Sequence, residues 1–152
     1  MDKKELDFIL QKGEDLKVEF KENLDKSFAK EIAAFANSEG GRIFLGVDDK
    51  KEIKGIKITN KLKSEIQDIA RKCDPSIKIK VFENILIIEV EEGENKPYSC
   101  KEGFYLREGP NSQKMKRDEI VDFIIGEGKT KFDELINKDF NFEKDFDEDK
   151  LD

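Results

Sequence analysis

The chain has 152 residues, of which 43% are charged and 36% are hydrophobic, and its formal net charge is −7. It contains no histidine, which excludes catalysis by Ser-His or Cys-His pairs and every histidine-ligated metal site. The two cysteines suggest no disulfide framework, no apolar run approaches the roughly 18 residues of a membrane span, and the first residues lack the pattern of a signal peptide. We therefore expect a cytoplasmic protein with reduced thiols and no membrane partner.

The predicted elements begin with a short helix and a half-buried strand. Leu6, Ile9 and Leu10 share one helical face, and Gly13 stops the helix. Between residues 16 and 20, apolar and charged side chains alternate. This alternation predicts a strand with one solvent-exposed face.

The following stretch, from residue 27 to residue 49, organises the chain. A helix is predicted over 27–37, capped by Asp25 or Ser27, because its apolar residues recur at helical spacing. Gly40 and Gly41 stop this helix, since glycine accepts the left-handed conformation of a last turn. The apolar run 43–47 then predicts a central strand that is buried on both faces.

The second half of the chain contributes one more long helix and several strands. Thr59 or Asn60 caps a helix that ends at Asp74-Pro75. Strands are predicted at 53–56 as a short hairpin partner of the central strand, at 77–81 and 85–90 as an antiparallel pair, and at 104–106. A loop at 109–112 leads to a last helix around 120–124, which Gly126 closes. This order predicts an α+β (mixed α/β) fold, in which a mixed, largely antiparallel sheet has helices packed on it.

The charge is unevenly distributed along the chain. Residues 131–152 contain nine acidic and four basic side chains, so the first 130 residues have a net charge of only −2. We expect one domain over 1–128, and an acidic tail or the start of a following region over 129–152.

Acidic side chains near the first strand form one candidate site. Glu14 follows Gly13, and Glu19 lies on the open face of the strand with Lys21 beside it. Asp48 or Asp49, at the end of the central strand, would supply a third carboxylate. Three carboxylates suit a divalent cation that polarises a phosphate, whereas the alternative is a solvated strand face and an ordinary turn.

A basic segment forms a second candidate site. Its members are Lys101, Arg107, Ser112, Lys114, Lys116 and Arg117. Cations, a hydroxyl group and loop amides near a helix start are typical of a phosphate-binding surface. The alternative is a solvated loop before a helix cap.

Four segments resemble the Schlafen-type AlbA-like domain. They are Val-Glu-Phe-Lys at 18–21, Ala-Phe-Ala-Asn-Ser-Glu-Gly-Gly at 34–41, Gly-Val-Asp-Asp at 46–49 and Phe-Tyr-Leu-Arg-Glu-Gly-Pro-Asn-Ser at 104–112. The resemblance covers about residues 8–126, with the motifs in the family's order. In bacteria and archaea such domains open larger proteins described as transcriptional regulators or as relatives of a DNA helicase, so the resemblance implies DNA binding.

The same resemblance implies an alternative activity. In animal Schlafen proteins, similar domains cleave structured RNA with three carboxylates, which match Glu14, Glu19 and Asp49 by motif. As catalytic residues these three would hold Mg²⁺ or Mn²⁺, and Lys21 would stabilise the developing phosphate charge. The animal enzymes pair two such lobes, so this single lobe would need a homodimer.

The function that we expect is therefore nucleic-acid binding, most directly DNA binding, by a domain of a transcriptional regulator. A metal-dependent endoribonuclease of the Schlafen type is the first alternative. A protein-interaction or dimerisation module is the second.

Overall fold

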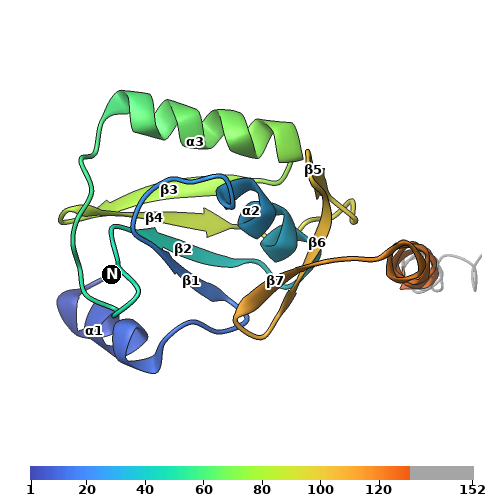
Figure 1. Ribbon diagram of the computed structural model, residues 1–152, viewed down its shortest axis with the longest axis horizontal. Coiled ribbons are helices and arrows are strands. Elements are labelled where there is room, and N and C mark those ends of the chain that lie inside the picture. Colours follow the sequence, from blue (N-terminus) through green and yellow to red (C-terminus); the bar gives the residue numbers. More distant parts are fainter. Residues whose placement is uncertain (131–152) are drawn as a thin grey trace, which may run out of the picture. The chain divides into compact units, whose positions relative to one another are not determined.

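The computed structural model describes residues 1–130, so most of the predicted tail, from 131 to 152, lies outside the described residues. The chain divides into two compact units, Met1–Met115 and a part that begins at Lys116 (Figure 1). The predicted boundary between residues 128 and 129 stays a prediction.

Within the first unit, four strands form a mixed sheet in the order β1-β2-β4-β3. The strands are β1 (Val18–Lys21), β2 (Gly41–Leu45), β3 (Ile77–Phe82) and β4 (Ile85–Val90). Only the β1–β2 pair is parallel, while β4 runs antiparallel to both β2 and β3. The predicted α+β class with a largely antiparallel mixed sheet is thus confirmed.

Strand β2 is buried on both faces, as its apolar run predicts. Ile43 and Leu45 pack with the two helices α2 (Phe28–Asn37) and α3 (Asn60–Cys73). Phe44 packs on the opposite face with α1 (Lys3–Lys12), so the sheet has helices on both sides (Figure 1). The segment after β2 makes one isolated bridge, Val47 to Ile53, and does not form the predicted hairpin strand. The Lys54 and Gly55 amides both donate to the Gly46 carbonyl oxygen, which is not the pattern of a regular strand pair.

The helix ends follow the local sequence. The Asp2 and Thr59 side chains accept hydrogen bonds from the first turns of α1 and α3. Asp74 has the left-handed conformation that terminates α3. The Ser27 residue precedes α2 without forming a side-chain cap, because its hydroxyl group is bonded to the Asp25 carboxylate.

A second, smaller sheet in the first unit comprises β5 (Ser99–Cys100), β6 (Gly103–Glu108) and β7 (Asn111–Lys114). The predicted loop over 109–112 is wrong in its length, because Gly109 and Pro110 complete the turn and pairing resumes at Asn111. The buried side chain of Asn37 connects helix α2 to this second sheet. Its side chain donates to the carbonyl oxygens of Tyr98 and Tyr105 at 2.9 and 2.8 Å, and accepts from the Tyr98 amide.

In the second unit the described part is a helix over residues 117–130. Gly126 lies inside this helix and does not close it as predicted, since one glycine costs a helix only about 1 kcal/mol. No helix within residues 1–130 is both long and apolar enough to span a bilayer.

Candidate functional site

The side chain of Arg107, on β6, is completely buried and binds acidic groups from two other elements. Its Nη1 donates to Glu19 Oε1 on β1 at 2.8 Å and to Glu31 Oε2 on α2 at 2.9 Å. Its Nη2 donates to the carbonyl oxygens of Asp15 and Val18, both at 2.9 Å. One guanidinium group therefore ties the small sheet to β1 and α2.

Two further contacts fix the guanidinium plane. The Arg107 carbon Cζ lies 4.6 Å from the centre of the buried Phe35 ring, which forms a cation–π contact. The Ser112 hydroxyl group of β7 accepts from Arg107 Nη1 at 3.0 Å and donates to the Glu31 carboxylate. Arg107 Nε is also buried but has no acceptor among the described residues. We call Arg107, Glu19, Glu31 and Ser112 the arginine cluster.

Glu19 is the chemically unusual member of the arginine cluster. Burial raises its pKa from 4.5 to about 8, helped by a hydrogen bond with Glu14 and by the nearby charge of Glu31, although Arg107 acts in the opposite direction. Glu14 is itself held in place, because its Oε2 accepts from the Phe20 amide at 3.0 Å. The raised pKa means that the Glu19 carboxyl group holds its proton to a higher pH than an exposed glutamate does, so that it can donate a hydrogen bond to Glu14.

This raised pKa predicts a pH-dependent stability. The unfolded chain loses the Glu19 proton near pH 4.5 and the folded chain near pH 8, so this carboxyl group stabilises the fold fully at low pH and progressively less as the pH rises to about 8. Between these two values, the free energy of unfolding of the wild type is expected to fall by up to about 1.4 kcal/mol per pH unit because of Glu19. Glu19→Gln should remove this decline. Urea unfolding between about pH 5 and about pH 8 measures it.

The matched control is Glu22→Gln, which changes an exposed carboxylate just after the same strand. It should leave the pH profile of the wild type unchanged. Equal profiles for Glu19→Gln and the wild type would show that Glu19 is ionised throughout this range.

The structure places the predicted metal ligands differently. Glu14 and Glu19 are hydrogen-bonded, but Asp49 is exposed in the turn that follows β2, and the third carboxylate near Glu19 is Glu31. Within residues 1–130, no three acidic or cysteine side chains form a group suited to hold a metal. Because Arg107 already bonds to the Glu19 and Glu31 oxygens, these residues do not fit the Mg²⁺ or Mn²⁺ site that the resemblance implied.

Lys21 lies two residues after Glu19 on β1, so both side chains are on the same face of the strand. Its ammonium group is also bonded to other residues. Its Nζ donates to the Ser27 hydroxyl group and lies 3.4 Å from the Asp25 carboxylate. The side chain is only 9% exposed. In this arrangement Lys21 fixes the loop between β1 and α2.

The basic segment is divided between the interior and the surface. Arg107 was predicted to contact phosphate, but the structure places it in the core, where no phosphate reaches it. Ser112 is bonded to the same cluster. The remaining members of the predicted set are exposed: Lys101, Lys114, Lys116 and Arg117.

No role was predicted for Glu31, although its position in the sequence indicates one. It precedes Phe35 by four residues, so both lie on the same face of α2. Arg107 likewise follows the buried Tyr105 by two residues on β6, which assigns both to one face of the strand. Together, an acid on an otherwise buried helix face and a base on a buried strand face indicate an internal ion pair.

Comparison with known proteins places this arrangement in a family. The model of the family described as "Schlafen, AlbA_2" matches residues 14–116, which include the whole arginine cluster. The crystal structure of the DIP2311 protein from Corynebacterium diphtheriae is similar in fold, with a TM-score of 0.54 and 20% sequence identity. That match covers 71% of this chain and 23% of the other, and at this identity it shows the fold alone. The chain, matched over more than half of its length, belongs to the Schlafen AlbA_2 family.

Proposed function

We propose that this domain binds nucleic acid, most directly duplex DNA, as the DNA-binding part of a transcriptional regulator. The observation that carries the proposal is a group of exposed cations at the end of the small sheet and in the residues that follow it, in a protein whose net charge is −7. We call Lys101, Lys114, Lys116 and Arg117 the basic set. Phosphate contacts by such side chains dominate the affinity of proteins for DNA.

The two members of the basic set that belong to the first unit, Lys101 and Lys114, both lie near the start of β6. Lys101 is in the turn between β5 and β6, and the Lys114 side chain lies against Gly103, where a Cβ atom would be 3.0 Å from Lys114 Cε. Neither lysine forms an ion pair with another described residue, so both ammonium groups are available to phosphate. Lys116 and Arg117 follow in the sequence and begin the second unit.

The arginine cluster supports this role by holding the strand that presents Lys114. Ser112 on β7 is bonded both to Arg107 and to Glu31 of α2. Lys114 is two residues further along the same strand. A rigid strand lowers the conformational cost of binding, which favours a phosphate contact at this position.

Reversing three charges of the basic set should weaken binding without regard to sequence. Lys114→Glu, Lys116→Glu and Arg117→Glu together are expected to lower the affinity for duplex DNA by at least about tenfold at low salt. They should also reduce the slope of log affinity against log salt by about one per lost contact. Fluorescence anisotropy of a labelled duplex measures both quantities.

The control is a triple variant with the same change in total charge, placed on other surfaces of the protein. Lys4, Lys61 and Arg71 are exposed cations on α1 and α3, and their combined change to Glu should have a much smaller effect. Equal losses in the two triple variants would mean that only the net charge matters. Unchanged affinity in the basic-set variant would favour the protein-interaction module instead.

The endoribonuclease is the second candidate function. The observation in its favour is the contact between Glu14 and Glu19, two of the three residues that match the family's carboxylates. Two observations argue against an endoribonuclease: Asp49 is exposed, and the Glu19 carboxyl group already accepts a hydrogen bond from Arg107.

A further inference from the structure

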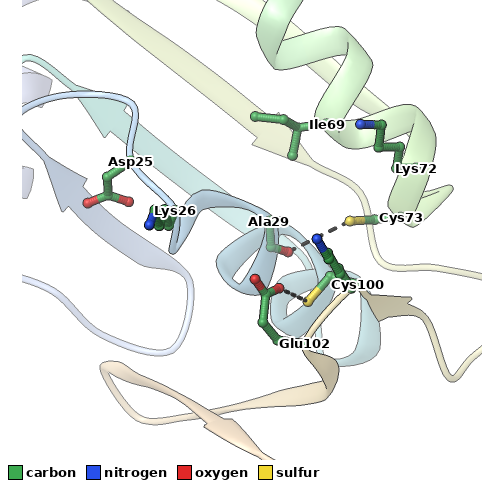
Figure 2. Close-up of a pocket in the computed structure, with 9 residues that line it drawn as sticks. Asp25, Lys26, Ala29, Ile69, Lys72, Cys73, Cys100 and Glu102 are labelled. Carbon is green, nitrogen blue, oxygen red and sulfur yellow. Dashed lines mark hydrogen bonds between the residues drawn. The ribbon is translucent and has the colours of Figure 1, made fainter.

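A pocket of about 290 Å³ lies outside the arginine cluster, where α2, α3 and the β5–β6 turn meet (Figure 2). Its wall is formed by Ala29 of α2, Ile69 and Cys73 of α3, and Cys100 of β5. These side chains also pack against the main hydrophobic core, so the pocket has an ordered apolar wall.

The rim of the pocket is positively charged. Lys26 from the β1–α2 loop, Lys72 from the last turn of α3 and Lys101 from the β5–β6 turn border it. All three are exposed, and none forms an ion pair with another described residue. Three cations from three separate elements therefore line one small cavity.

The two acids that line the pocket do not cancel this charge. The Asp25 carboxylate accepts from the amide and the hydroxyl group of Ser27 and lies 3.4 Å from Lys21 Nζ. Glu102 Oε2 accepts from the Cys100 thiol at 3.4 Å. With Asp25 balanced by Lys21, the rim keeps an excess of cations.

We propose that this pocket binds a single phosphorylated nucleotide, with its base against the apolar wall and its phosphate among Lys26, Lys72 and Lys101. An apolar wall with a few charged groups at the edge is typical of sites for small amphipathic ligands. A volume of about 290 Å³ is at the small end of the usual range, which suits one nucleotide and not a longer segment. The identity of the ligand rests on the proposed function, because Lys101 also belongs to the basic set.

The nucleotide has two sources, a free nucleotide and the phosphorylated end of a bound strand. The probes are therefore AMP, a 5′-phosphorylated oligonucleotide and the same oligonucleotide with a 5′-hydroxyl group. Adenosine and inorganic phosphate provide the two halves of the ligand separately. Both halves should bind more weakly than AMP, because each uses only one of the two surfaces of the pocket.

The thiol on the pocket wall gives a local readout. Cys100 is free and half-buried, whereas the free Cys73 is buried. AMP or the 5′-phosphorylated strand should slow alkylation of Cys100 in the folded protein. Cys73, the other thiol of the pocket wall, is only 4% exposed and should react only when the protein unfolds, so its alkylation reports unfolding. Protection by AMP identifies a site for free nucleotides, while protection by the phosphorylated strand alone identifies a site for strand ends.

Neighbouring residues on α3 provide a matched pair of variants. Lys72→Gln should weaken binding of the protecting ligand about five- to tenfold in calorimetry, whereas Arg71→Gln, one residue earlier and outside the pocket, should not. Lys26→Gln should weaken it to a similar extent. Failure of both AMP and the phosphorylated strand to protect Cys100, or equal affinities of Lys72→Gln and the wild type, would overturn the proposal.

The same variants separate this pocket from the basic set. The triple variant of Lys114, Lys116 and Arg117 should lose duplex binding and keep AMP binding. Lys72→Gln should show the opposite pattern. If the protein binds AMP in the pocket but binds no duplex, the nucleotide site stands and only the proposed DNA-binding function is contradicted.

Discussion

Replacing Arg107 by methionine is expected to lower the free energy of unfolding by about 3–5 kcal/mol. The guanidinium group is fully buried and hydrogen-bonded to Glu19, Glu31 and two carbonyl oxygens, so its removal leaves buried acceptors without a donor. Methionine preserves much of the packing volume, which makes the lost charge the main change. Urea unfolding monitored by circular dichroism measures the effect.

The control for this substitution is Arg71→Met, at an exposed position on α3 where we expect a change within about 0.5 kcal/mol. Adding Glu31→Gln to Arg107→Met should recover part of the loss, because the neutral amide removes the negative charge that Arg107 no longer balances. A loss below about 1 kcal/mol for Arg107→Met would contradict a structural role for the arginine cluster.

Replacing Phe35 by alanine is expected to cost about 3–5 kcal/mol, since the ring is completely buried. The same ring packs beneath the Arg107 guanidinium group and approaches Gly41 so closely that a Cβ there would lie 2.5 Å from it. The substitution therefore leaves a cavity next to both β2 and the arginine cluster. Thermal unfolding and the urea midpoint report the loss.

Phe8→Ala provides a comparison for Phe35→Ala with the same chemical change. Phe8 is 65% exposed on α1, and we expect its truncation to cost less than about 1 kcal/mol. Similar losses at the two positions would show that Phe35 is not part of a close-packed core.

Elements with strong local patterns could be predicted from the sequence. The apolar run at 43–47 and the alternation at 77–81 placed β2 and β3, because burial on a sheet imposes a period of two or a continuous apolar segment. The predicted cap at Thr59 or Asn60 and the Asp74-Pro75 pair marked the two ends of α3, and the structure selects Thr59 as the cap.

Features that depend on distant contacts could not be predicted. Strand β7 is polar and short, and only its pairing with β6 makes it a strand. The contact from Arg107 to Glu19 spans 88 residues, so no local pattern distinguishes this buried arginine from an exposed phosphate ligand. The same holds for the third carboxylate, which comes from α2 in the structure and not from the end of β2.

Nucleic-acid binding is tested most directly by incubating the purified chain with labelled duplex DNA and labelled tRNA at low salt, with and without Mn²⁺. The mixtures are read for a mobility shift on native gels and for cleavage on denaturing gels. We expect a shift that does not require Mn²⁺, with the nucleic acid intact. The absence of any shift would contradict binding, and Mn²⁺-dependent cleavage that Glu19→Gln abolishes would establish the endoribonuclease in its place.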